Sequence, residues 1–174
     1  MKKSALVLSI IFASINFIYS QVNLTVIAPP PSNAVSSFNT PNGTSLFTTC
    51  RGAYIITQSE LNALTAGNLI SSIGFSLDSG TPSVPVSGNF TMYVQNTSNT
   101  TYAKGFNWPA ILSGMTNVYS SVMTIPATAN NAIISFSLPT AFTYTGGGLY
   151  VAFDWESTGP FDANPATFIM TNVS

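Results

Sequence analysis

The chain has 174 residues, of which 45% are hydrophobic and 5% charged, with four basic and five acidic side chains and no histidine. So few basic residues cannot neutralise a run of phosphates, which excludes nucleic-acid binding and makes an anionic membrane surface a poor partner. The lack of histidine removes the commonest general base and the commonest transition-metal ligand.

The first twenty residues are typical of a secretory signal peptide. Lys2 and Lys3 form a basic start, residues 5–17 are an apolar run, and the small residue Ser20 precedes Gln21. This is the order of an n-region, an h-region and a cleavage site, and the run is shorter than the about 20 residues of a membrane-spanning helix. We expect cleavage between Ser20 and Gln21, and a secreted or cell-surface protein with no membrane span in the mature chain.

The mature chain is expected to begin with a short strand and a proline-rich strap over residues 21–44. Residues 23–27 are the candidate strand, and the three prolines at 29–31 favour extended, solvated backbone. A β-sandwich domain is expected over residues 45–174. Because the sequence stops on a strand-like segment, we expect this domain to be truncated at its C-terminus.

Alternation of apolar and polar side chains predicts a series of strands. One wet face on each sheet favours antiparallel pairing. A single short helix is expected near residues 58–64, because Thr57 and Glu60 have the spacing of a capping box. The sequence thus predicts an all-β, antiparallel, jelly-roll-like β-sandwich. Its strands are expected over residues 45–49, 52–57, 68–78, 89–95, 117–125, 132–138, 149–156 and 167–173.

The clearest of these strands follows three glycines at 146–148. Its alternation predicts one face buried against a second sheet and the other face in water. The inward set is Leu149, Val151, Phe153 and Trp155, and the outward set is Tyr150, Ala152, Asp154 and Glu156.

Asp154 and Glu156 lie on that outward face, about 7 Å apart by strand rise. Paired carboxylates can hydrolyse a glycosidic bond, but no neighbouring residue that would tune an acid can be identified, and a solvated strand face is the favoured interpretation. Asp78 beside Ser79 and Gly80, or Asp154 with Asp162, are candidates for a structural Ca²⁺ ion. No calcium-loop spacing is present, so no metal site or cofactor is predicted.

Cys50 is the only cysteine, so no disulfide can form within the chain. A small, buried side chain in a strand is the favoured interpretation. A thiol that pairs with another chain is the alternative.

Three aromatic residues lie in the long irregular stretch at residues 96–114: Tyr102, Phe106 and Trp108. They are the candidate ligand-binding residues, because flat apolar rings with polar rims can stack on sugars. The alternative is that they fold back and cap the sandwich, as aromatic residues of long loops usually do.

Four segments in series carry a family resemblance: 51–61 (RGAYIITQSEL), 69–75 (LISSIGF), 90–94 (FTMYV) and 141–153 (AFTYTGGGLYVAF). Their order resembles the N-terminal β-sandwich modules of large bacterial surface and adhesin-like proteins exported by the type IX secretion system. The resemblance implies a jelly-roll-like sandwich followed by further modules and a C-terminal sorting domain, which is not seen in this sequence. It implies no catalytic residues.

The leading hypothesis is a non-catalytic extracellular module of a larger secreted or cell-surface protein, which serves adhesion or glycan binding. Its expected partners are extracellular polysaccharide or surface glycans, and other domains of the same longer protein. Two alternatives remain. One is a ligand-free spacer, and the other is the accessory domain of a secreted hydrolase whose catalytic part lies beyond residue 174.

Overall fold

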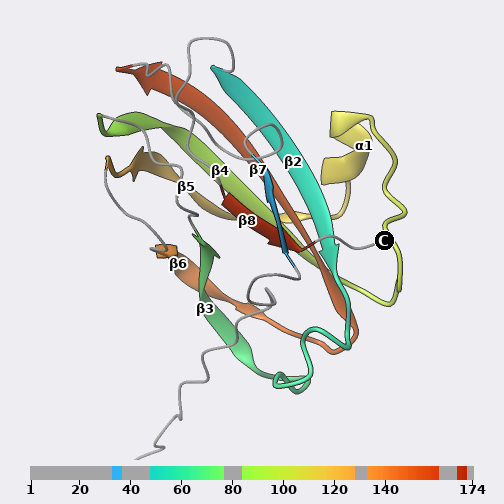
Figure 1. The fold of residues 1–174 in the computed structure, drawn as a ribbon. Coiled ribbons are helices and arrows are strands. Elements are labelled where there is room, and N and C mark those ends of the chain that lie inside the picture. Colours follow the sequence, from blue (N-terminus) through green and yellow to red (C-terminus); the bar gives the residue numbers. More distant parts are fainter. Residues whose placement is uncertain (1–32, 37–47, 77–83, 128–132, 161–167, 172–174) are drawn as a thin grey trace, which may run out of the picture.

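The computed structural model describes residues 33–36, 48–76, 84–127, 133–160 and 168–171. This part of the chain forms eight strands and one short helix (Figure 1). In chain order the elements are β1 (Asn33–Ser36), β2 (Thr49–Ile56), β3 (Leu69–Ser76), β4 (Val86–Thr97), α1 (Trp108–Leu112), β5 (Thr116–Ile125), β6 (Ile133–Thr143), β7 (Gly148–Gly159) and β8 (Phe168–Thr171). No helix among the described residues is long and apolar enough to cross a membrane.

The strands pair in a nested pattern. β4 pairs with β5, β3 with β6, β2 with β7 and β1 with β8, and every pair is antiparallel. β7 also pairs with β4, which gives a four-stranded sheet of order β2-β7-β4-β5. The β3–β6 and β1–β8 pairs belong to the other layer, where β3 contacts β8 (Figure 1). A long hairpin folded over on itself in this way is a jelly roll, which confirms the predicted fold class.

The strands predicted over residues 52–57 and from 68–78 onward agree with β2 to β8, apart from differences of a few residues at the ends. The strand predicted over residues 45–49 is not a separate element among the described residues, because Thr49 already begins β2; residues 45–47 lie outside the described ranges. The predicted strand at residues 23–27 lies outside the described residues. β1 falls within residues 21–44, beyond the strand predicted at residues 23–27. It was not predicted, because four residues are too few for a clear alternation. β6 runs past its predicted end through Pro139, which a strand tolerates here because the register shift opposite Ile70 and Ser72 leaves the proline outside the ladder.

The position predicted for the short helix is wrong. Residues 58–63 form turns, in which the Thr57 carbonyl accepts from the N–H groups of Glu60 and Leu61, both at 3.1 Å. The capping contact itself is present, since the Glu60 carboxylate accepts from the Thr57 N–H at 2.8 Å. A helix does not follow because nucleation is costly and the segment buries only Leu61 fully.

The helix of the described chain is α1, which begins after Asn107. The Asn107 side chain accepts from the Ala110 N–H at 3.3 Å, and Pro109 occupies the first turn, where it has no hydrogen bond to lose. Ile111 is its buried residue.

The core lies between the two layers and is built on aromatic rings. Phe90 of β4 stacks on Phe136 of β6 with ring centroids 4.7 Å apart, and this pair links the two layers of the sandwich. Phe75 of β3 meets Phe136 and Phe153 edge-on, each at 5.9 Å. Trp155 of β7 is completely buried. Burial of each such ring contributes roughly 1.5–3 kcal/mol relative to exposure.

The glycines before β7 allow that strand to start close to the end of β4. Gly147 has φ +78°, and a Cβ at this position would collide with the carbonyl oxygen of Thr97. Gly67 also has a positive φ, +94°, but has open space around it. Alanine substitutions at these two positions therefore separate two costs: that of a positive φ, which both share, and that of a close backbone approach, which only Gly147 has.

We expect Gly147→Ala to lower the free energy of unfolding by about 2 kcal/mol more than Gly67→Ala does. Both variants place alanine in the left-handed region, at a cost of roughly 1–2 kcal/mol, and only the first meets the Thr97 carbonyl. Urea unfolding measures both values. Equal losses would show that the close approach is not a constraint.

Candidate functional site

The outer face of β7, which faces away from the core, is partly covered. The prediction of a wet face is wrong for Tyr150 and Ala152, which are 3% and 0% exposed. The loop between β4 and α1 lies over Tyr150, whose hydroxyl accepts from Asn99 Nδ2 at 2.7 Å and from the Ala103 N–H at 3.1 Å. Alternation could not reveal this, because the cover comes from a segment fifty residues away in sequence.

The three aromatic candidates behave differently. The Tyr102 ring packs edge-on against Tyr150 at 5.8 Å, and Trp108 packs edge-on against Tyr93 at 6.4 Å. Phe106 is fully exposed. Tyr102 and Trp108 thus hold the loop and α1 on the sheet, and only Phe106 projects into solvent without a share in that packing.

Lys104 ties the same loop to α1 and β7. Its ammonium group donates to the carbonyls of Ile111 at 2.8 Å and Ser113 at 2.7 Å, at the end of α1, where a cation is favourable. It also lies 5.3 Å from the centre of the Tyr150 ring. Burial lowers the pKa of Lys104, against a smaller opposite effect of Tyr150.

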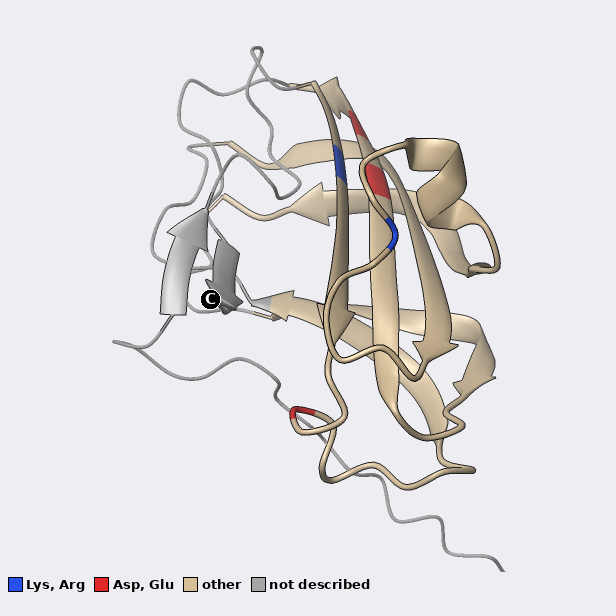
Figure 2. Cartoon of the chain, turned by 90° about the vertical axis from the view of Figure 1, so that its right-hand side faces the viewer, with Lys and Arg blue, Asp and Glu red and all other residues tan. Residues whose placement is uncertain are grey.

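Beyond Ala152 the outer face opens into a polar hollow, which we call the sheet groove. The strand register places Arg51, Asp154 and Thr91 in one row across the sheet, and Thr49, Glu156 and Asn89 in the next. The basic and acidic positions of β2 and β7 lie side by side on the face that α1 flanks (Figure 2). The groove has a volume of about 470 Å³ and is lined by Thr49, Cys50, Arg51, Asn89, Thr91, Asp154 and Glu156.

Arg51 connects the groove to Trp108, the first residue of α1. Its Nε lies 3.0 Å from Asp154 Oδ2, and its guanidinium carbon lies 5.3 Å from the centre of the Trp108 ring. The Arg51 and Asp154 side chains are 57% and 30% exposed, so the ion pair contributes at most about 1 kcal/mol to stability. Its main effect is positional, because it orients a carboxylate and an indole at the same rim.

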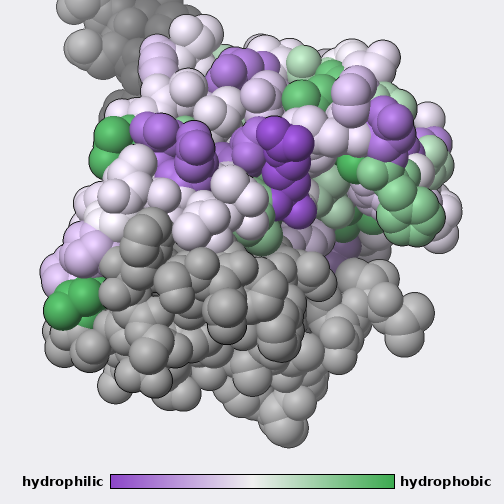
Figure 3. Space-filling model, turned by 90° about the horizontal axis from the view of Figure 1, so that it is seen from above, coloured by the Kyte–Doolittle hydropathy of each residue, from purple (hydrophilic) through white to green (hydrophobic). Residues whose placement is uncertain are grey.

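Seen from above, strongly hydrophilic residues gather on the described part of the upper surface, with hydrophobic residues at their margin (Figure 3). The groove residues come from β2, β4 and β7. Polar groups on paired strands are held at fixed spacings, which favours recognition of an extended polar ligand over the burial of a small apolar one.

Sequence reasoning found Asp154 and Glu156 but missed Arg51, Asn89 and Thr91. Arg51 and Asp154 are 103 residues apart, and only the β2–β7 register brings them together. Arg51 lies between the strands predicted over residues 45–49 and 52–57, so its charge, opposite to that of Asp154, was the one available signal, and charge alone does not specify a pairing.

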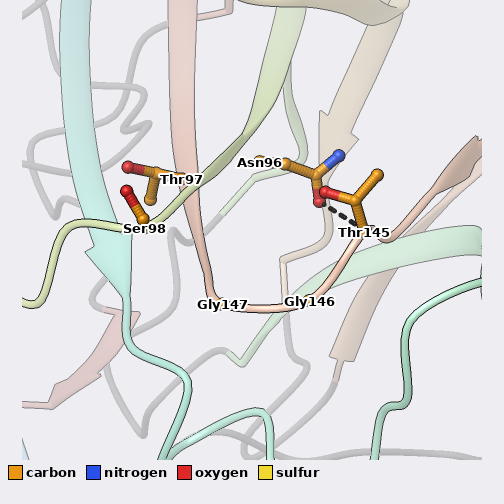
Figure 4. A pocket seen from close by; sticks show the side chains of 6 residues that line it. All are labelled: Asn96, Thr97, Ser98, Thr145, Gly146 and Gly147. Carbon is orange, nitrogen blue, oxygen red and sulfur yellow. Dashed lines mark hydrogen bonds between the residues drawn. The ribbon is translucent and has the colours of Figure 1, made fainter.

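A second hollow, of about 380 Å³, lies at the turn before β7 (Figure 4). The Asn96 side chain accepts from the Thr145 N–H and donates to the Thr143 carbonyl, both at 3.0 Å. Both polar atoms of the Asn96 side chain therefore hold the turn in place. The hollow is lined by Asn96, Thr97, Ser98, Thr145, Gly146 and Gly147.

Among the described residues no group of three or more His, Cys, Asp or Glu side chains could hold a metal ion. The calcium candidates Asp78 and Asp162 lie outside the described ranges, as do Ser20 and Gln21 of the predicted cleavage site.

Cys50 is buried beneath the groove, on the core side of β2. Burial, and secondarily the negative charge of Asp154, raises the pKa of the Cys50 thiol to about 11. A thiol of this kind is nearly all protonated at neutral pH and is a poor nucleophile.

Comparison of the chain with protein-family models, with curated proteins and with solved structures finds no match.

We expect Tyr150→Phe to lower the free energy of unfolding by about 1–2 kcal/mol, because the hydroxyl that accepts from Asn99 and Ala103 is removed while the ring is kept. Tyr93→Phe is the matched control, since its hydroxyl makes no hydrogen bond to the described residues. Chemical denaturation measures both. A Tyr150→Phe variant as stable as the wild type would contradict the role given to this hydroxyl.

We expect the stability of the wild type to fall relative to Cys50→Ala between pH 9 and pH 11. The native pKa of about 11 lies above the ordinary value of 9.0, so the unfolded chain loses its proton first. The loss is about 1.4 kcal/mol per pH unit in that window and absent below it. Unfolding free energies at several pH values test this, and parallel curves for the two proteins would refute it.

Proposed function

We propose that the protein is a non-catalytic extracellular β-sandwich module that binds glycans and so serves adhesion, within a larger secreted or cell-surface protein. The observation that carries this proposal is the sheet groove, an open row of polar side chains on three hydrogen-bonded strands.

The chemistry of the groove suits sugar hydroxyls, each of which can both donate and accept. Arg51 and Asn89 supply N–H donors, and the carboxylates of Asp154 and Glu156 supply strong acceptors. Trp108 adds an apolar ring at the rim, although the Arg51 guanidinium lies over that ring. Because the strands hold these groups in place, little ordering is needed on binding.

The arrangement of the carboxylates supports a binding role over hydrolysis. A glycosidase needs two carboxyl groups that flank the scissile bond. Asp154 and Glu156 instead extend from the same face of one strand, and Asp154 is engaged by Arg51. The chain has no histidine that could supply another general base.

The proposed location rests on the sequence. Residues 1–20 have the pattern of a signal peptide, and the resemblance to bacterial surface modules points to the same compartment and to type IX export.

The test is a glycan microarray probed with the wild-type protein, followed by calorimetric titration of the glycans that bind. Asn89→Ala removes a groove amide and is expected to weaken binding about fivefold to tenfold. Asn117→Ala is the matched control, because Asn117 is an exposed asparagine on β5 of the same sheet, outside the groove. Absence of binding to any glycan would refute the proposal and favour the spacer alternative.

A further inference from the structure

The charges in the sheet groove do not balance. Arg51 and Asp154 form an ion pair and cancel, whereas Glu156 is exposed and has no basic side chain opposite it, since its cross-strand neighbours are Thr49 and Asn89. The groove therefore carries a net negative charge located at Glu156.

No other cation of the described chain is available to the groove. Lys104 is the second basic residue there, and its ammonium group is already bound to the carbonyls of Ile111 and Ser113 at the end of α1. Arg51 binds Asp154 through Nε, so its terminal NH2 groups can still donate hydrogen bonds, but the Asp154 carboxylate already offsets its positive charge.

We propose that Glu156 makes the groove selective for glycans without acidic groups, so that it accepts neutral or amino sugars and rejects uronic, sialic and sulfated ones. This inference rests on the proposed function. The Glu156 carboxylate accepts hydroxyl hydrogens from the sugar, while Asn89 and Thr49 on either side supply further hydrogen bonds. A carboxylate or sulfate on the ligand would face a like charge with no compensating cation.

The experiment compares neutral and acidic oligosaccharides on one array, with homogalacturonan oligosaccharides and their methyl esters as a pair that differs in the charge and in one methyl group at each uronate. The wild type is expected to prefer the neutral member, and the preference to shrink at high salt because the groove is open to solvent. Glu156→Gln keeps the shape of the side chain and is expected to raise binding of acidic relative to neutral glycans by roughly fivefold.

Glu60→Gln is the matched control. It changes the net charge by the same amount away from the groove, and glutamine can keep the capping contact with Thr57. This variant is expected to leave the ratio of neutral to acidic binding unchanged.

The outcomes separate the two proposals. Wild-type binding mainly to acidic glycans, or an unchanged ratio in Glu156→Gln, would overturn the selectivity and leave glycan binding standing. Absence of binding to both classes would overturn the proposed function itself. A shift of the ratio in Glu156→Gln but not in Glu60→Gln would support both.

Discussion

The structure depends on β7, which is hydrogen-bonded to β2 on one side and to β4 on the other. Along residues 149–153 this strand is buried on both faces. Its inner face contributes Phe153 and Trp155 to the core, and its outer face holds Tyr150 beneath the loop. A one-residue shift in the register of β7 would therefore turn its inward side chains outward and its outward side chains inward, and so disrupt the core, the anchor of the loop and the groove together.

The groove exists because the cover over β7 ends at Ala152. Where the loop lies on the sheet, the outward residues are aromatic or small. Where the sheet is open, they are charged or polar, as at Asp154 and Glu156. Arg51 stands at the boundary, paired with Asp154 and stacked on Trp108. The same packing that closes one part of the face thus orients the side chains of the open part.

Local alternation was enough to predict most strands and the all-β antiparallel class, because every inward position of a strand requires an apolar side chain and so leaves a period of two in the sequence. It was not enough for the helix, since Thr57 and Glu60 form their capping contact without a helix behind it. The groove could not be predicted either. Its rows join residues that are distant in sequence, such as Arg51 and Asp154. These residues become neighbours only through the register of the paired strands.

We propose that ligands bind in the sheet groove. The most direct measurement is amide chemical-shift mapping of the labelled protein during titration with a glycan that binds on the array. Binding in the groove is expected to perturb the amides of Thr49–Arg51, Asn89–Thr91 and Asp154–Glu156, which the strand register brings together. Perturbations confined to the hollow around Asn96 and Gly147, or to Phe106, would contradict it.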